Sequence, residues 1–409
     1  MPRVLLIVTT RSYRAGAFVD AARALGVPLT VASERSQALA AFQPDGHLVL
    51  DPGAPAALDT VLRFAAAHPL GAVIAADDDG VALAARACQR LQLPHHPPDA
   101  VRAARVKIAM RERFAAVGVP GPWFTVARRG EDAAALRGRV RFPCVVKPPD
   151  LSASRGVMRA NDGAELSVAL ERLARMPEAG NRVLIEGYVP GVEVALEGLV
   201  TAGRLRTLAL FDKPDPLEGP TFEETIYVTP SRLPEPVRDA IARRAQEMVT
   251  SLGLSHGPVH AELRVNDEGQ WPIEIAPRSI GGWCSRVLRF AGGASLEMLL
   301  LRHALGEDVS AIAREPDAAG VMMIPVPAAG VFEGVGGVER ARAVAGVEDV
   351  RIAVAPGETL VPLPESSRYV GFIFARAPGA DAVEAALRAA HGLLTFDVRP
   401  AVPSRGETP

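Results

Sequence analysis

Short apolar runs alternate with segments of helical spacing over the first hundred residues. The runs typical of buried strands are residues 4–8, 29–32, 47–50 and 72–76. Segments with an apolar face at helical spacing lie between and after them, at residues 15–25, 58–68 and 81–91. Such alternation is typical of an α/β domain with a doubly wound parallel sheet. The segment His95-His96-Pro97-Pro98 breaks the pattern and marks the expected end of this domain.

The pattern then becomes richer in strands. After a helix expected at 98–117, strands are expected at 140–148, 182–188, 192–200, 205–211, 258–265 and 271–277, with helices at 164–175, 234–252 and 295–305. A small α/β cap is expected at the end, with strands at 321–325, 350–354 and 369–375 and a helix at 381–390. The predicted domains are therefore residues 1–104, 105–310 and 311–400, followed by a frayed tail at 401–409.

Composition and charge exclude several classes of protein. The 409 residues are 48% hydrophobic, enough to bury a large core, and 45 Lys+Arg against 47 Asp+Glu leave a formal charge of −2. Neither nucleic acid nor a membrane surface is therefore an expected partner. The N-terminal apolar run is too short for an export signal, and Cys88, Cys144 and Cys284 lie too far apart to suggest a disulfide framework. We expect a cytoplasmic protein.

A predicted hairpin carries the strongest chemical signal. With Val265 opposite Trp271 across an Asn-Asp-Glu-Gly turn, Glu262 falls opposite Glu274. Directly opposed residues have Cβ atoms about 4.5–5.5 Å apart, so the two carboxylates need a cation, and Mg²⁺ suits hard oxygen ligands. Arg278 follows on the same face, where it is suited to bind an anionic oxygen. The alternative is an ordinary exposed hairpin face with scattered charges.

Familiar nucleotide and metal motifs are absent from the sequence. It contains neither a P-loop nor the dinucleotide-binding glycine fingerprint after the first strand. His256 and His260 with Glu262 superficially suggest zinc, but Gly257-Pro258 lies between the histidines, and ligands four residues apart share a face only on a helix.

Further candidates lie upstream of the hairpin. Lys147 ends an apolar strand, and the small residues that follow at 152–156 are suited to close over phosphates. Lys107 lies near the start of a helix, and Glu186 and Glu193 flank a Pro-Gly bend between two strands. Each feature alone also fits a solvated lysine, a plain turn or strand-end carboxylates.

Taken in order, these features resemble the ATP-grasp superfamily over about residues 105–310. The resemblance implies a two-lobed central domain that binds ATP with Mg²⁺, or alternatively Mn²⁺. The implied nucleotide residues are Lys107 and Lys147 at the phosphates, Ser152, Ser154 and Gly156 in a flap, Glu186, Tyr188 and Val189 at adenine, and Glu193 at ribose. Glu262 and Glu274 would be the metal ligands, and Lys147, Glu274 and Arg278 the catalytic residues. Many members have Asn where this chain has Ala276, so a second metal is not implied.

Residues 211–220, 223–225, 260–262 and 278–283 resemble the amino-acid ligase branch, which includes carnosine-type synthetases. That branch joins a carboxylate to an amine through an acylphosphate, and its members are small-molecule enzymes for which a homodimer is the default expectation. The implied substrate residues are Glu223, Glu224, His260, Arg278, Gly281, Gly282 and Trp283. The alternatives are a carboxylase that uses bicarbonate, like biotin carboxylase or purine-pathway enzymes, and an ATP-binding module without turnover.

Overall fold

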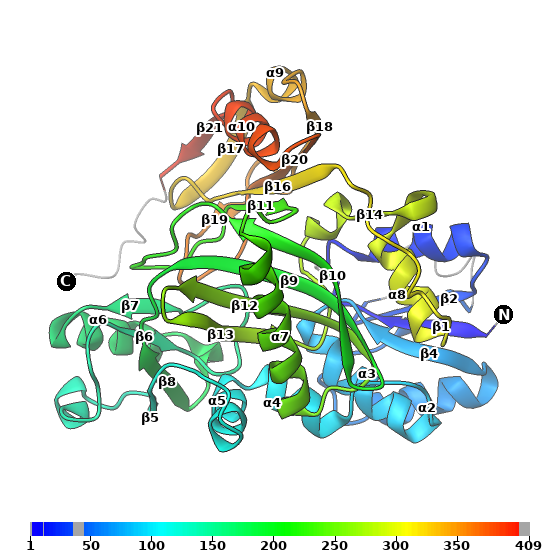
Figure 1. The fold of residues 1–409 in the computed structure, drawn as a ribbon, viewed down its shortest axis with the longest axis horizontal. Coiled ribbons are helices and arrows are strands. Elements are labelled where there is room, and N and C mark those ends of the chain that lie inside the picture. Colours follow the sequence, from blue (N-terminus) through cyan, green and yellow to red (C-terminus); the bar gives the residue numbers. More distant parts are fainter. Residues whose placement is uncertain (1, 11, 36–44, 401–409) are drawn as a thin grey trace. The chain divides into compact units, whose positions relative to one another are not determined.

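A computed structural model describes residues 2–10, 12–35 and 45–400 (Figure 1), so the tail expected at 401–409 lies outside the described residues. The chain divides into two compact units. The first comprises the chain up to Gly121 with Val194–Leu210 and Leu233–Pro316, and the second comprises Pro122–Glu193, Phe211–Arg232 and the chain from Asp317 onward.

The first unit begins with the predicted doubly wound sheet. Its elements are β1 (Arg3–Ile7), α1 (Ala15–Leu25), β2 (Leu29–Ser33), β3 (His47–Val49), α2 (Ala57–Ala67), β4 (Leu70–Ala75) and α3 (Asp78–Leu91). The strands are parallel in the order β3-β2-β1-β4, with α1 on one face and α2 and α3 on the other (Figure 1). The strand order reverses between β1 and β4, so the segments that follow these two strands, including Ser12 and Asp77, meet at one edge.

The rest of the first unit packs helices on an antiparallel sheet portion. Its elements are α4 (Pro98–Arg105), α5 (Lys107–Ala116), α7 (Glu235–Leu252), β12 (Gly257–Asn266), β13 (Gly269–Ala276), β14 (Arg289–Phe290), β15 (Ala294–Ser295) and α8 (Leu296–Ala304), with 3₁₀ turns at Cys284–Val287 and Ala291–Gly293. The single helix expected at 98–117 is wrong, because Val106 is extended and separates α4 from α5. Phe114, Met248 and Ile275 belong to the core that these helices form with β12 and β13.

Two long strands run through both units. They are β9 (Val192–Thr201) and β10 (Arg204–Lys213), which lie beside β12 in the order β13-β12-β9-β10. Nearly every residue of β9 is buried, as its continuous apolar run suggests.

The second unit contains a small antiparallel sheet covered by α6. Its elements are β5 (Phe124–Arg128), β6 (Cys144–Lys147), β7 (Met158–Ala160), α6 (Gly163–Ala174) and β8 (Arg182–Gly187), with 3₁₀ turns at Ala133–Leu136 and Pro177–Ala179. The strand order is β5-β8-β6-β7, and Val146, Leu170 and Ile185 share its core. The sequence patterns did not predict β5 or β7, the two edge strands.

The cap, residues 317–400, completes the second unit. Its elements are β16 (Ala318–Ile324), β17 (Gly330–Gly336), α9 (Val338–Arg342), β18 (Val347–Ile352), β19 (Thr359–Leu360), β20 (Gly371–Ala377), α10 (Ala380–His391) and β21 (Thr395–Arg399). Strand β11 (Ile226–Thr229) pairs with β16, which continues to β20 and β18, while β19, β17 and β21 form a separate sheet. In the described ranges, no helix has the length and apolar character needed to cross a membrane.

Candidate active site

The predicted hairpin brings two carboxylates together in the first unit. Glu262 pairs with Glu274, as predicted, although the register at the turn is different: Trp271 lies opposite Arg264 rather than Val265. A two-residue turn shifts the pairing by one, and a bulge between Glu262 and Leu263 restores it. The buried Arg111 donates to the carbonyl oxygens of Pro272 at 2.9 Å and Ile273 at 3.1 Å, which stabilises the bulge.

A buried lysine lies next to this carboxylate pair. Lys107, the first residue of α5, places Nζ 3.1 Å from Glu274 Oε2 and is 5% exposed. The two opposed carboxylates offer hard oxygen ligands of the kind that Mg²⁺ prefers, and the Lys107 ammonium offsets part of their negative charge. Ala276 lies opposite His260 and offers only a methyl group.

Arg278 follows β13 and is held from the N-terminal sheet. Its Nη2 lies 2.8 Å from Oδ2 of Asp78, the first residue of α3, and its Nη1 donates to the Ser279 carbonyl at 3.0 Å. Burial lowers the pKa of Arg278, but the carboxylates of Asp78, Glu274 and Glu197 outweigh burial and raise it. The guanidinium is therefore a fixed positive charge suited to bind an anionic oxygen.

His260 lies between two carboxylates. Its Nδ1 donates to Glu197 Oε2 at 3.2 Å, and its Nε2 lies 3.5 Å from Glu262 Oε1. Burial lowers the pKa of His260, but hydrogen bonds and charges from both glutamates raise it to about 9. Glu197 is fully buried, which raises its pKa, and it also accepts the Ile280 N–H at 2.9 Å. Sequence reasoning missed Glu197, although a carboxylate in the apolar run of β9 was an available signal.

The segment after Arg278 is anchored by buried contacts within the first unit. Arg14, 1% exposed, donates to Ser279 Oγ at 2.6 Å, to the Ile280 carbonyl at 3.1 Å and to Glu297 at 2.9 Å. Trp283 Nε1 donates to the Tyr13 carbonyl at 2.8 Å. The predicted substrate residues Gly281, Gly282 and Trp283 therefore belong to a firmly held segment. Sequence reasoning missed Arg14, for which the sequence has no local signal.

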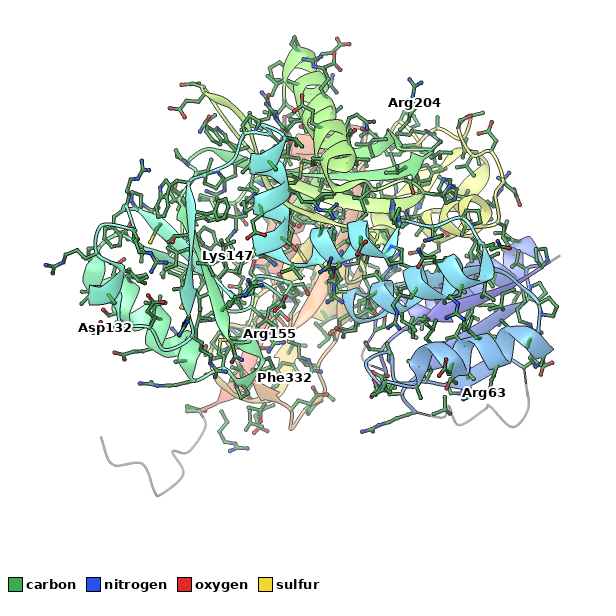
Figure 2. The ribbon with its side chains drawn as sticks, turned by 90° about the horizontal axis from the view of Figure 1, so that it is seen from below. Arg63, Asp132, Lys147, Arg155, Arg204 and Phe332 are labelled. Atoms are coloured by element: carbon green, nitrogen blue, oxygen red, sulfur yellow. The ribbon has the colours of Figure 1, made fainter. Side chains whose placement is uncertain are left out.

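In the second unit, Lys147 and Glu186 form a buried ion pair. Lys147 Nζ lies 2.5 Å from Glu186 Oε1, and the two residues are 6% and 2% exposed (Figure 2 labels Lys147). They are diagonal neighbours on adjacent strands, because Val145 of β6 pairs with Glu186 of β8. Lys147, which the resemblance places at the phosphates, thus contacts Glu186, which it places at adenine. Tyr188, also expected there, carries the Arg159 guanidinium 4.0 Å from its ring centroid.

The expected flap has a tightly curled backbone. Ala153, Ser154 and Gly156 have φ values of 53°, 57° and 70°, in the left-handed region that favours glycine. The Gly156 N–H donates to the Pro364 carbonyl at 2.8 Å. Two adjacent non-glycine residues in this region store backbone strain, which is common where a loop binds a ligand.

Lys213 connects two expected site residues of the second unit. Its buried Nζ lies 2.8 Å from Glu193 Oε1 and also bonds Glu224. Burial raises the pKa of the neighbouring Glu223, while a hydrogen bond from the Val326 N–H opposes this. Sequence reasoning missed Lys213 as a site residue, although it lies in the 211–220 stretch that resembles the amino-acid ligase branch.

The predicted residues thus fall into two sets, each within one unit. The first unit holds Lys107, His260, Glu262, Glu274, Arg278, Gly281, Gly282 and Trp283, and the second holds Lys147, Ser152, Ser154, Gly156, Glu186, Tyr188, Val189, Glu193, Glu223 and Glu224.

Comparison with known proteins identifies the family. Residues 19–95 match the ATP-grasp N-terminal domain, 140–287 the ATP-grasp domain, and 322–399 the L-amino acid ligase C-terminal domain 2. The crystal structure of an L-amino acid ligase from Bacillus licheniformis superposes with a TM-score of 0.80 and 25% identity, covering 98% of this chain and 100% of that one. The chain is an ATP-grasp protein, and its C-terminal domain and overall fold resemble those of an L-amino acid ligase.

Two further comparisons show a relative that this chain matches only in part and a structure that shares its fold. Carnosine synthase 1 from Gallus gallus is 30% identical over 247 residues, which are 56% of this chain and 26% of that protein. The chain thus spans about a quarter of that relative. The N5-carboxyaminoimidazole ribonucleotide synthetase structure from Thermotoga maritima has a TM-score of 0.72 at 15% identity, covering 98% of this chain and 100% of that one, and shows the fold alone.

Proposed function

We propose that this chain activates the carboxylate of an amino acid with ATP and joins it to an amine. The observation that carries the proposal is the opposed pair Glu262 and Glu274 beside Lys107, with Arg278 held in its charged form by Asp78. These groups supply a cation site and fixed positive charge, as transfer of a phosphoryl group to a carboxylate requires.

The proposed reaction has two steps. A carboxylate oxygen attacks the γ-phosphorus of ATP, the bond from that phosphorus to the β,γ-bridging oxygen breaks, and ADP leaves. The amine nitrogen then attacks the carbonyl carbon of the acylphosphate, the carbon–oxygen bond to phosphate breaks, and the amine releases a proton to solvent. The products are one amide, one ADP and one phosphate.

Glu262 and Glu274 are the residues that would hold Mg²⁺, or Mn²⁺ with the same donors. Bound there, the ion would supply positive charge to the polyphosphate. Lys107 and Arg278 would offset the remaining charge of the phosphoryl group. Because the Ala276 side chain has no oxygen that could bind a metal, we propose that one metal suffices and that Glu262 and Glu274 would hold it.

The remaining predicted residues are proposed to bind substrates. In the second unit, Lys147 with Ser152, Ser154 and Gly156 would contact phosphates, while Glu186, Tyr188, Val189 and Glu193 would contact the nucleoside. Glu223 and Glu224 are proposed to face the amine. In the first unit, Arg278 and the held segment 279–283, together with His260, are proposed to bind the amino-acid carboxylate.

A phosphate-release assay with ATP and Mg²⁺ tests this function. Single amino acids, amino-acid pairs and bicarbonate are compared as the second substrate, and products are identified by mass spectrometry. Phosphate release that requires an amino acid, with a matching amide, supports the ligase. Release that requires bicarbonate instead identifies a carboxylase, and ATP binding without release under any condition identifies a binding module; either result contradicts the proposal.

A further inference from the structure

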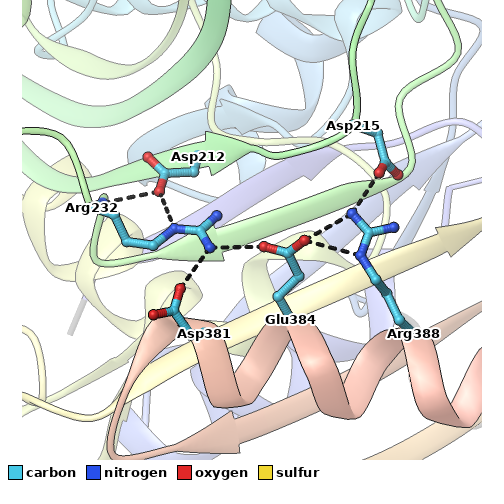
Figure 3. A network of polar contacts seen from close by, with 6 residues as sticks. All are labelled: Asp212, Asp215, Arg232, Asp381, Glu384 and Arg388. Carbon is cyan, nitrogen blue, oxygen red and sulfur yellow. Dashed lines mark hydrogen bonds and ion pairs between the residues drawn. The ribbon is translucent and has the colours of Figure 1, made fainter.

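An ion-pair network attaches residues 213–225 to the cap (Figure 3); they comprise the last residue of β10 and the connection to β11. Arg388 of α10 donates from Nη2 to Asp215 Oδ1 at 2.6 Å and from Nε to Glu384 Oε1 at 2.9 Å. Asp215 also accepts the hydroxyl of Thr225, the last residue of the segment. One carboxylate therefore joins both ends of the segment to the cap.

Arg232 makes a second attachment in the same network. Its backbone N–H and Nε donate to Asp212 Oδ2 at 2.9 and 3.0 Å, and its Nη1 donates to Asp381 at 2.9 Å and Glu384 at 2.8 Å (Figure 3). Glu384, with 19% of its side chain exposed, thus bridges both arginines. Isolated surface ion pairs contribute little, but a shared and partly shielded network holds its members in one geometry.

The cap backbone makes a third attachment, at the acidic residues of the segment. The Val326 N–H donates to the Glu223 carboxylate, and the Met323 N–H donates to the Thr225 carbonyl at 2.7 Å. Glu224 bonds the buried Lys213 at the other end of the segment. Glu223 and Glu224, the two residues proposed to face the amine, are thus held between cap contacts and Lys213.

These attachments come from the domain that carries the L-amino acid ligase match, residues 322–399, which includes Val326, Glu384 and Arg388. The segment itself contains Pro214, Pro216, Gly219 and Pro220 and has no regular structure between β10 and β11. Without outside contacts, a segment of this kind samples many conformations, and ordering it costs conformational entropy. The cap contacts supply this order together with Arg159, whose side chain donates to the Glu218 carbonyl and whose backbone N–H donates to the Pro220 carbonyl, both at 2.9 Å.

We propose that Arg388 is a positioning residue that holds the 213–225 segment for capture of the amine. This inference rests on the proposed function. When the segment is loose, the amine is not held, and a water oxygen attacks the carbonyl carbon of the acylphosphate in its place. The bond to phosphate breaks as before, and the products are the original amino acid and phosphate. Loss of Arg388 therefore separates phosphate release from amide formation, while carboxylate activation continues.

The first arm of the test measures amide hydrogen exchange in the full-length protein without ligands. In Arg388→Gln, exchange over residues 213–225 rises about fivefold, the factor that corresponds to loss of one strong ion pair in a network. The control is Arg399→Gln, which removes an exposed cap ion pair with Glu333 at 2.8 Å. Unchanged exchange in Arg388→Gln overturns the inference. If Arg388→Gln fails to fold, Asp215→Asn removes the same ion pair from the other side.

The second arm measures phosphate released per amide formed, with ATP, Mg²⁺ and a mixture of the twenty proteinogenic L-amino acids. The ratio is expected near one for the wild type and Arg399→Gln, several-fold higher in Arg388→Gln, and partly restored in Arg388→Lys. If exchange rises in Arg388→Gln but the ratio of phosphate to amide stays unchanged, the network is merely structural and the inference is overturned. Loss of phosphate release in this variant also overturns it. A wild type that forms no amide contradicts the proposed function, whereas the exchange arm concerns the cap contacts alone.

Discussion

Acid should destabilise the first unit through the buried His96. This residue is 5% exposed; its Nδ1 accepts the N–H groups of Ser255 at 3.1 Å and His256 at 3.2 Å, and its Nε2 donates to the Pro258 carbonyl at 3.1 Å. The neutral ring satisfies all three partners, and a proton on Nδ1 would displace two donors. Burial lowers the pKa of His96 to about 4, although the bond to Pro258 opposes this.

The coupling between proton binding and folding gives the sign and size of the effect of acid on the free energy of unfolding. The pKa in the folded protein is about 4 against 6.5 in the unfolded chain, so the folded state binds fewer protons. The stability that neutral His96 contributes is fully present above pH 6.5 and is lost as the pH falls toward 4. Two and a half pKa units correspond to at most about 3.4 kcal/mol, of which about 2 kcal/mol is lost by about pH 5. Burial lowers the pKa of His303 to about 4 as well, which adds a similar loss.

Urea unfolding at about pH 7.5 and about pH 5 measures this loss in the wild type and in His96→Asn. Asparagine keeps an acceptor for the two N–H groups but does not titrate. We expect the free energy of unfolding to fall with acid by about 2 kcal/mol less in the variant than in the wild type. Equal losses in the two proteins would refute the reasoning, because His96 would then have the same pKa in both states.

Three further predictions concern the site. Gly156→Ala brings a Cβ within 2.8 Å of neighbouring side chains at a φ of 70° and should weaken ATP binding about tenfold by calorimetry, whereas Gly138→Ala, with a φ of 86° and open space, should not. Asp78→Asn removes the partner of the site arginine and should lower kcat/KM for the amino acid about ten- to hundredfold, and the exposed Asp79→Asn should stay within about twofold. Ala276→Asn adds an oxygen donor and should tighten Mn²⁺ binding several-fold by electron paramagnetic resonance; equal affinity would show that this position does not face the metal.

Helices and strands were predictable where the spacing of apolar residues stays regular over the whole element. Helix α1 spans residues 15–25, as expected, because its apolar face repeats cleanly and Gly26 ends it. The boundary between α4 and α5 was not predictable in this way, since Val106 is apolar and fits the helical pattern on both sides. The edge strand β5 has no alternation in burial, and β7 alternates but is only 3 residues long, too short for a period to show in the sequence.

The candidate site likewise has features that the sequence pattern predicts and features that it does not. The pairing of Glu262 with Glu274 was predicted correctly, but the register at Trp271 was not, because a bulge leaves no mark in the alternation of apolar and polar residues. Arg14 and Arg388 were missed for a different reason. Their partners lie far along the chain, with Ser279 265 positions from Arg14 and Asp215 173 positions from Arg388, and such contacts exist only once the chain has folded.

Isotope transfer tests the central claim most directly. The wild type is incubated with ATP, Mg²⁺ and L-amino acids labelled with ¹⁸O in the carboxylate, and the released phosphate is analysed by mass spectrometry. If the carboxylate attacks the γ-phosphorus and an amine then displaces phosphate, each phosphate carries one ¹⁸O atom and one amide forms with it. Lys147→Ala and Glu274→Ala, which alter the proposed phosphate and metal residues, should retain the fold and release no labelled phosphate. Unlabelled phosphate from the wild type, or normal labelling in both variants, would contradict the account.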